Sequence, residues 1–556
     1  MKKSFLKKSL SVLLAGTMAV SMAGCGGGSD SGQPSSGTAG TSSDANASAD
    51  NTNASADNAS TSGEDLFGDE VTINVMVWDR GNAAPNTTTE NNALTKWVQE
   101  QVKEKFNINV EYTAVPRSGS DDKLNIMMTG GTSPDIVFTY SQELYYNYAN
   151  SGALKDLSPF YSQYGSDIEK YCGEAQDIGL LGDARYAVMK QRGEESARHI
   201  AYIRKDWLDE LGMEVPKTKA ELGECLQAFK DNNMGGSKTV PWGMSGRSDT
   251  EKGYLNFVGS YVDLPTDREA YIYNESYVVV APGAKDGLKQ LNEWYNAGLI
   301  TQDFPTDQAE DVLKADISNG NVGFVLDDAT QRWDQFKILN QEAGHETFVP
   351  VQCFDLSDGS YRNPYEQRYA MFVMIPAGTS DEKTTACMKY LNWLADPEVA
   401  KTVRFTPDGT TNDLGAMSEP TEEEKNAAGY PGTPDDLCIM NLNFDWVNDY
   451  DVLAKTNIEN DTKAGVNWVD EAWYQNFYKV RETGKYRYPV YGQISEAEQT
   501  YGTDVKTSML ELVYRVICCP TDQFESTYET AYKELVNTKH LQDILDARAE
   551  YYDSQQ

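Results

Sequence analysis

The spacing of apolar and polar residues changes several times along the chain, and each regular stretch predicts a helix or a strand. Apolar side chains occupy every second position of residues 71–77, which predicts a strand, and the same alternation returns over residues 106–112. Residues 90–106 carry apolar side chains three and four positions apart, which predicts an amphipathic helix. A strand, a helix and a strand in this order predict a βαβ unit of a parallel sheet.

Capping residues and glycines predict where other helices begin and end. Thr218 and Glu221 have the spacing of a capping box, so we expect a helix to start there. Ser380 is expected to cap another helix. Residues 202–212 are predicted to be a short helix that Gly212 ends.

The remaining pattern alternates buried strands, loops and helices. Short strands are predicted at residues 134–138 and 320–326. Residues 406–440 are rich in Pro, Gly, Thr and Asp, which predicts an extended loop. The C-terminal third is predicted to be helical and rich in aromatic residues. Strands and helices therefore mix along most of the chain, which indicates an α/β protein.

The N-terminus has the pattern of a secretory signal. Four lysines precede an apolar stretch over residues 10–20. This stretch is too short and too mixed to span a membrane as a helix. We therefore expect the signal to be removed rather than to remain in a membrane.

The end of this signal resembles the lipobox of bacterial lipoproteins. Ala23 and Gly24 stand directly before Cys25, and Met22 lies where Leu is usual in that motif. The resemblance implies that residues 1–24 are a signal peptide and that Cys25 carries the lipid. The alternative is an ordinary cleaved signal followed by a chance cysteine.

The segment after Cys25 is predicted to be a flexible tether. Residues 26–63 are almost entirely Gly, Ser, Ala, Thr, Asn and Asp, and they contain no aromatic residue. Such a segment buries too little apolar area to offset the entropy lost on ordering, so residues 25–65 are expected to be disordered. As a flexible coil the tether spans on the order of 35 Å.

The charge of the chain restricts its partners. It has 85 acidic and 48 basic residues, for a net charge of −37, and loss of the four signal lysines brings the mature chain to −41. Such a surface repels nucleic acid and anionic lipid, whereas neutral and cationic ligands remain possible. The acidity is explained equally well as an aid to solubility. The roughly 490 residues after the tether are enough for two or more domains.

The cysteines do not indicate a metal centre. Seven of the eight cysteines remain once Cys25 is set aside, and their spacing is irregular. We expect them to be small buried side chains. The adjacent Cys518 and Cys519 leave a strained vicinal disulfide as an alternative.

Several blocks together resemble the large extracellular solute-binding proteins of bacterial ABC importers, in the lipoprotein branch that captures oligosaccharides. The matching blocks are residues 131–137, 202–218, 298–300, 319–324 and 393–399. Their order and spacing make the set more specific than any one block.

This resemblance implies a two-lobed α/β fold of the periplasmic-binding-protein type, with a hinge and an interlobe cleft. Residues 66–200 would begin lobe 1, and residues 201–325 would form the main part of lobe 2. Residues 326–556 would return to complete both lobes and end in a mainly helical region.

The resemblance also implies a function. A monomer anchored by its lipid to the extracytoplasmic face of the cell membrane would capture a neutral oligosaccharide and deliver it to the ABC permease. The alternatives are a binding protein for a peptide or another small solute, and a tethered surface glycosidase.

One departure from the resembling proteins concerns calcium. In calcium-binding relatives, the helix after the block at residues 202–218 runs into an acidic loop like an EF-hand. Here residues 231–241 keep one Asp and two Asn but lack the later carboxylates. A calcium ion needs six to eight oxygen ligands, so we expect no calcium at this loop and no cofactor in the protein.

Ligand-binding residues are expected just beyond the strand ends. Ligands of parallel sheets lie outside the carboxyl ends of the strands, and sugars offer apolar ring faces to aromatic side chains and hydroxyl groups to polar ones. The tryptophans at residues 97, 207, 294 and 393 lie on predicted helices at core spacing and are expected to pack internally. The candidates are Trp78, Asp79, Arg80, Tyr140, Ser141, Trp242, Asp327, Asp328, Trp333 and Arg362.

Enzymatic motifs are poorly represented. The three histidines, at residues 199, 345 and 540, have no metal-ligand spacing. The Gly243–Gly246 stretch lacks the final glycine of a nucleophile elbow, because Arg247 takes its place. The sequence therefore predicts a binding protein without catalytic residues, although a glycosidase needs only two carboxylates.

Overall fold

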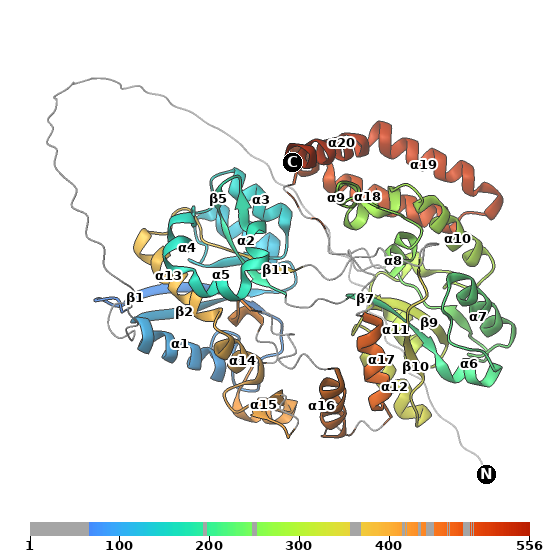
Figure 1. Ribbon diagram of the computed structural model, residues 1–556, viewed down its shortest axis with the longest axis horizontal. Helices are drawn as coiled ribbons and strands as arrows, with labels where there is room; N and C mark the ends of the chain where they lie inside the picture. Colours follow the sequence, from blue (N-terminus) through green and yellow to red (C-terminus); the bar gives the residue numbers. More distant parts are fainter. Residues whose placement is uncertain are drawn as a thin grey trace, which may run out of the picture. The chain divides into compact units, whose positions relative to one another are not determined.

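The side chains described by the computed structural model gather into two hydrophobic cores, which we call lobe 1 and lobe 2 (Figure 1). Lobe 1 draws its core from residues 71–189 and 369–440, and lobe 2 from residues 197–354 and 453–545. The chain therefore changes core three times along its length. The described residues are 66–192, 197–246, 253–355, 368–413, 417–418, 420–431, 435–440, 450–463, 465, 468–481, 490, 492 and 494–555.

Lobe 1 begins with the βαβ unit that the periodicity predicts. β1 (Val71–Asp79) and β2 (Ile108–Pro116) pair in parallel. α1 (Ala93–Phe106) connects them, and the Asn92 side chain caps its start by accepting hydrogen bonds from two backbone N–H groups. Apolar side chains are buried on one face of α1 and along β1 and β2. This burial confirms the helix and the strands that the sequence predicts.

A second sheet continues lobe 1 beside β1. Its strands are β3 (Val137–Thr139), β11 (Tyr369–Met374) and β6 (Ala187–Gln191), in the order β3-β11-β6 with antiparallel pairing. Ile136, directly before β3, forms a parallel bridge to Val75 of β1. β1, β2, β3 and β6 therefore run in the same direction and end at one edge.

Helices and a short hairpin complete lobe 1. Its helices are α2 (Ser120–Gly130), α3 (Gln142–Asn150), α4 (Ser158–Tyr164), α5 (Ser166–Cys172), α13 (Asp381–Leu394), α14 (Pro397–Phe405) and α15 (Glu422–Ala428). β4 (Leu180–Leu181) and β5 (Ala184–Arg185) form a hairpin of this lobe. Outside both cores, β12 (Thr410–Thr411) pairs with β13 (Met417–Ser418).

Lobe 2 is built on one mixed sheet. Its strands are β7 (His199–Arg204), β8 (Val240–Trp242), β9 (Val322–Asp328) and β10 (Phe348–Val351), in the order β10-β7-β9-β8. β8 and β9 are parallel, and β7 is antiparallel to both of its neighbours. The surrounding helices are α6 (Lys205–Leu211), α7 (Lys219–Asp231), α8 (Gly253–Gly259), α9 (Asp267–Ile272), α10 (Ala284–Asn296), α11 (Asp311–Ser318) and α12 (Trp333–Ala343).

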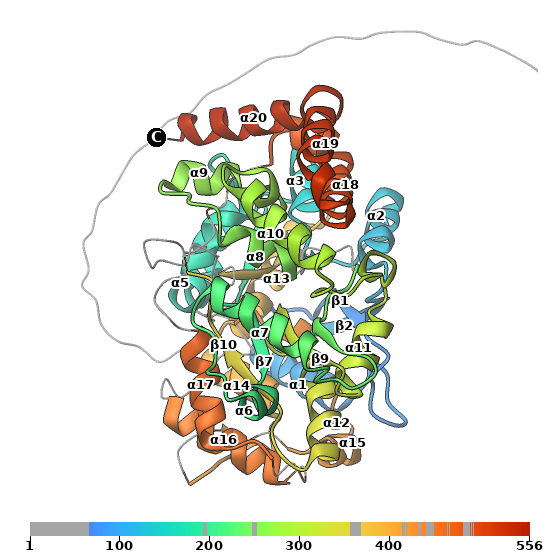
Figure 2. The same ribbon diagram turned by 90° about the vertical axis from the view of Figure 1, so that its right-hand side faces the viewer.

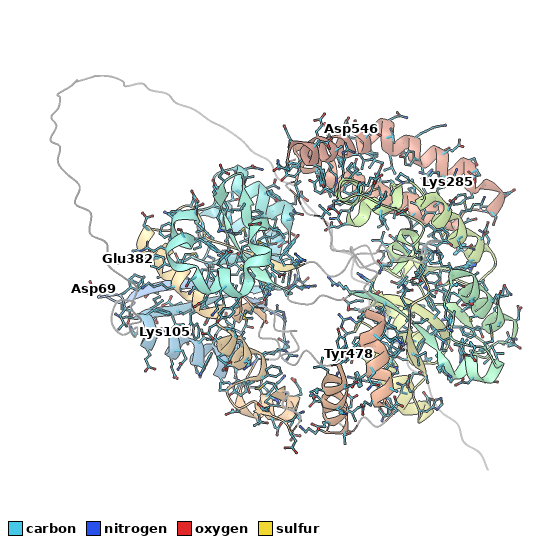
Figure 3. The ribbon with its side chains drawn as sticks, in the orientation of Figure 1. Asp69, Lys105, Lys285, Glu382, Tyr478 and Asp546 are labelled. Carbon is cyan, nitrogen blue, oxygen red and sulfur yellow. The ribbon has the colours of Figure 1, made fainter. Side chains whose placement is uncertain are left out.

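The C-terminal region is helical, as its sequence predicts, and packs into lobe 2. Its helices are α16 (Tyr450–Lys463), α17 (Glu471–Arg481), α18 (Glu496–Cys518), α19 (Phe524–Thr538) and α20 (Leu541–Ser554). α18 to α20 lie along α9 and α10 (Figure 2). Figure 3 labels Tyr478 of α17. Its ring stacks on that of Tyr450 of α16 with centroids 5.0 Å apart.

Two sequence-based expectations are wrong in detail. Residues 202–204 belong to β7 rather than to the helix that Gly212 ends, because they form ladder pairs with both β9 and β10. Residues 406–440 are not one extended loop, because they include α15, which a capping box from Thr421 and Glu424 opens. Among the described residues, no helix is both long and apolar enough to cross a membrane.

Candidate functional site

The strand ends of lobe 1 converge on the edge where the chain leaves this lobe. Asp79 and Pro116 are register partners at the ends of β1 and β2, and Thr139 ends β3 nearby. β6 ends at Gln191 at the same edge, just before the chain passes to lobe 2. In parallel sheets this edge is where ligands bind.

Two aromatic rings and one guanidinium form a cluster at this edge, which we call the lobe 1 platform. Trp78 and Tyr140 stack with ring centroids 5.1 Å apart and planes 29° apart. The Arg117 guanidinium lies 4.3 Å from the Trp78 ring centroid and 5.3 Å from that of Tyr140. Trp78 is only 2% exposed, whereas Tyr140 is 36% exposed. Tyr140 is thus the ring that meets solvent, and Trp78 supports it from below.

The platform includes a buried donor. The Trp78 Nε1 atom is buried and has no hydrogen-bond partner among the residues that the structure describes. A buried N–H group without an acceptor is costly, and a ligand oxygen or an ordered water is the usual solution.

Arg80 is held in place by an acidic residue from a distant part of the chain. Its guanidinium makes a two-pronged contact with Asp436, with N–O distances of 2.9 and 3.1 Å. Asp436 also accepts a hydrogen bond of 2.6 Å from the Trp78 backbone N–H. The exposed Asp79 carboxylate accepts hydrogen bonds from the Gly81 N–H and the Thr89 hydroxyl.

Ser141 has a structural contact of its own. Its hydroxyl oxygen accepts a hydrogen bond from the Leu144 N–H and caps α3, directly after Tyr140. The helix start therefore fixes the backbone that carries Tyr140.

In lobe 2, the equivalent strand ends are occupied by ion pairs. β9 ends at Asp328, which pairs in register with His199 at the start of β7, close to where the chain enters this lobe. Asp328 Oδ2 accepts a hydrogen bond from Arg198 Nε at 2.8 Å. Burial alone would raise the pKa of Asp328, but the Arg198 charge and hydrogen bonds hold it below its ordinary value.

Asp327 belongs to a buried triad with Arg332 and Glu310. The Arg332 side chain has no exposed surface, and its Nε lies 2.7 Å from Asp327 Oδ2 while its Nη2 contacts Glu310. Burial raises the pKa of Asp327 despite the adjacent guanidinium. Asp327 is therefore tied to the protein interior.

The two tryptophans proposed for lobe 2 differ in position. Trp333 is half-buried, and its Nε1 donates a hydrogen bond of 3.1 Å to the Tyr202 hydroxyl. Trp242 is 1% exposed and packs edge-to-face against Phe257 and Phe324. Its ring faces are thus taken up by the core, and we leave Trp242 out of the proposed binding surface.

The structure brings five of the ten candidates to one edge and places four others elsewhere. Trp78, Asp79, Arg80, Tyr140 and Ser141 share the lobe 1 edge. The remaining four described candidates lie in lobe 2, and Arg362 and Cys25 fall outside the described residues.

Sequence reasoning missed Arg117 and Asp436. Arg117 directly follows β2, so applying the strand-end rule to every strand would have found it. Asp436 is 356 positions from Arg80, and no local pattern connects the two.

No metal site emerges among the described residues, in which no group of three or more His, Cys, Asp or Glu side chains is arranged to hold an ion. In the loop at residues 231–241, Asp231 accepts a hydrogen bond from Gln227, and Lys238 pairs with Asp316 at 2.6 Å. The absence of calcium at this loop stays a prediction.

The seven described cysteines are free thiols, including Cys518 and Cys519, so the vicinal disulfide is absent. Five of them are buried, and these two are half-buried. The reading of the cysteines as small core side chains therefore holds for the five.

Comparisons with known proteins give matches over most of the chain. The family described as bacterial extracellular solute-binding protein matches residues 84–401, more than half of the chain. The polygalacturonan/rhamnogalacturonan-binding protein YtcQ of Bacillus subtilis is 25% identical over 257 residues, which are 44% of this chain and 51% of the relative. The matched region of this chain thus covers about half the length of this relative.

Solved structures share the fold. An HMO-binding solute-binding protein associated with an ABC transporter, from Bifidobacterium longum infantis, aligns over 87% of this chain and 99% of its own, with a TM-score of 0.61 and 15% identity. FusA of Streptococcus pneumoniae, solved with kestose, aligns over 87% and 99% with a TM-score of 0.58 and 15% identity. At these identities the likeness shows the fold alone, and it confirms the predicted two-lobed α/β class.

Proposed function

Because this chain belongs to the bacterial extracellular solute-binding protein family, we propose that it is the substrate-binding protein of an ABC transporter. In this proposal it captures a neutral oligosaccharide between its lobes and delivers it to a membrane permease. The observation that carries the proposal is the lobe 1 platform, which places an exposed aromatic ring at the strand edge where the chain leaves lobe 1.

The chemistry of the platform suits a sugar. Sugar rings have apolar faces that pack on aromatic rings, and their hydroxyl groups both donate and accept hydrogen bonds. Tyr140 provides the ring and Arg117 provides donors. The relatives support the sugar class, since YtcQ is named for pectic polysaccharides and FusA was solved with kestose.

The N-terminal pattern supports a proposed location for the protein. We propose that Cys25 is lipidated and holds the protein at the extracytoplasmic face of the cell membrane, where it works as a monomer. In this proposal residues 25–65, which the sequence predicts to be a tether, let the binding domain turn toward the permease. Replacing Cys25 with alanine should release the protein into the medium, whereas an unchanged membrane fraction would contradict the anchor.

Binding without catalysis completes the proposal. Family and fold are those of transport binding proteins, which supports binding without catalysis. A peptide or another small solute remains the second candidate ligand, because the platform's ring and charges would also accept a peptide.

A thermal-shift panel separates sugar from peptide. We expect neutral oligosaccharides to raise the melting temperature of the wild type, and peptides to leave it unchanged. Tyr140→Ala should weaken the sugar affinity roughly tenfold through lost stacking. Tyr450→Ala is a matched control, since Tyr450 is 37% exposed and lies on α16 of lobe 2. Stabilisation by peptides alone would overturn the sugar assignment.

A further inference from the structure

A single buried carboxylate holds the end of β1, the strand that carries Trp78 of the lobe 1 platform. This carboxylate belongs to Asp436, in a short 3₁₀ turn (Asp435–Leu437) that packs against β1. Its side chain is only 5% exposed. Its Oδ2 accepts hydrogen bonds from the Trp78 backbone N–H and from Arg80, and its Oδ1 accepts a second one from Arg80. Asp436 therefore holds both the main chain and a side chain of this strand.

At this point Asp436 takes the place of a neighbouring strand. The Met76 N–H donates a hydrogen bond of 2.9 Å to the carbonyl oxygen of Ile136, directly before β3. Backbone N–H groups two residues apart point to the same side of a strand, so the Trp78 N–H faces the same side as that of Met76. Its acceptor is the Asp436 carboxylate, at 2.6 Å, from a segment 358 positions away. A side chain thus fixes the end of β1 where the pairing with β3 no longer does.

These contacts extend to the exposed ring of the platform. The Arg80 guanidinium lies 5.3 Å from the Trp78 ring centroid, so Asp436 holds Trp78 through its backbone and through a cation at its ring. Trp78 in turn stacks on Tyr140, whose ring is 36% exposed. Binding side chains that buried hydrogen bonds hold in place before the ligand arrives lose less freedom on binding, and this raises affinity.

We propose that Asp436 is a positioning residue for ligand binding, which holds Trp78 and Arg80 so that the Tyr140 ring is already in place to pack on a sugar. Asp436 acts on the ligand through Trp78 rather than by touching it. This inference rests on the proposed function and deepens it, because it gives ligand affinity a determinant that lies far from the platform in the sequence.

The same strand offers a matched control in Asp135. Its Oδ2 accepts a hydrogen bond of 2.9 Å from the Asn74 backbone N–H and one of 2.8 Å from Lys383. Asp135 is thus also a largely buried carboxylate, 14% exposed, that holds a backbone N–H of β1 and a basic side chain. It holds the strand four residues before Trp78. Loss of either carboxylate should lower the melting temperature, but only loss of Asp436 should weaken sugar binding.

Calorimetric titration with the neutral oligosaccharide that most stabilises the wild type measures these affinities. Asp436→Ala should weaken binding about tenfold, because Trp78 and Arg80 lose their common partner. Asp436→Asn keeps an acceptor oxygen for the Trp78 N–H but loses the charge that pairs with Arg80, so its loss should be smaller, about threefold. Asp135→Ala should stay within about twofold of the wild type. Circular dichroism verifies that each variant is folded.

A double-mutant cycle separates positioning from general damage to lobe 1. In the wild type, Tyr140→Ala is expected to cost about tenfold in sugar affinity. In the Asp436→Ala background it should cost only about threefold or less, because the ring is no longer held in place. In the Asp135→Ala background Tyr140→Ala should keep its full cost. A merely structural role of Asp436 would leave the cost of Tyr140→Ala the same in all three backgrounds.

Several results would overturn the inference. One is wild-type sugar affinity in Asp436→Ala, and another is an equal loss in Asp436→Ala and Asp135→Ala. An undiminished cost of Tyr140→Ala in the Asp436→Ala background is a third. If Asp436→Ala does not fold, Asp436→Asn serves for the same comparisons. A wild type that binds no neutral oligosaccharide would contradict the proposed function itself, which separates the two failures.

Discussion

Arg332 is enclosed by lobe 2 and shares its guanidinium between Asp327 and Glu310. The Ser245 hydroxyl also donates a hydrogen bond of 3.0 Å to Glu310. The Glu310 carboxylate is therefore contacted by both Arg332 and Ser245. Removing one partner of a buried ion pair leaves uncompensated charge in the interior, which is far more costly than losing an exposed pair.

Replacing Arg332 with methionine should therefore lower the free energy of unfolding by about 3–5 kcal/mol. The exposed Lys533–Glu529 pair supplies the control, since Lys533→Met should cost less than about 1 kcal/mol. Urea unfolding of both variants measures the difference. Equal losses in the two variants would contradict the structural role given to the triad.

Glu346 gives the stability of lobe 2 a pH dependence. Burial, and then the nearby Asp470 charge, raise the pKa of Glu346 to about 8, although Lys205 opposes the shift. The folded protein then holds a proton that the unfolded chain has released, so stability falls as the pH rises from about 4.5 to about 8.

Substituting Glu346 with glutamine should remove this dependence. The variant and the wild type should melt together at pH 4, and the variant should melt at the higher temperature at pH 8.5. Thermal melts across this range test the sign, and a variant that is less stable than the wild type at pH 8.5 would contradict it.

At the level of single residues, the sequence located strand ends, and the roles of the candidate residues stay predictions. Trp78 and Tyr140 follow from the alternation in β1 and the apolar run before β3. Trp242 met the same rule, yet its ring turns into the core, because a strand-end position does not fix the direction of a side chain. Asp436 could not be found, since its contact with Arg80 is set by tertiary packing.

At the scale of elements, local sequence motifs predict where helices begin more accurately than where strands begin and end. The Thr218 hydroxyl oxygen accepts a hydrogen bond from the Glu221 N–H, and the Glu221 carboxylate accepts one from the Thr218 N–H. Both bonds involve residues three positions apart, so the sequence contains the whole motif. By contrast, residues 202–204 form a strand because they pair with β9 and β10, which lie more than 100 positions away.

Thr218→Ala should lower the free energy of unfolding by about 1 kcal/mol, since the first turn of α7 loses its cap. Thr218→Ser keeps the hydroxyl and should stay close to the wild type. Denaturant titrations of the two variants measure the effect. Equal destabilisation by serine and alanine would mean that the cap contributes nothing.

At the scale of the whole molecule, each lobe is assembled from segments that are far apart in the sequence. Lobe 1 combines residues 71–189 with 369–440, so its sheet closes only after the chain has built most of lobe 2. Periodicity reveals the elements but not which distant strands pair. The family resemblance supplied the two-lobed arrangement, and the comparisons confirm it.

We propose that the two lobes capture a neutral oligosaccharide without turnover. Calorimetric titration of the whole protein with the best neutral oligosaccharide of the panel, followed by mass analysis of the recovered sugar, tests it most directly. We expect one bound oligosaccharide per chain and an intact sugar afterwards. Cleaved sugar, or no heat of binding with any neutral oligosaccharide, would contradict it.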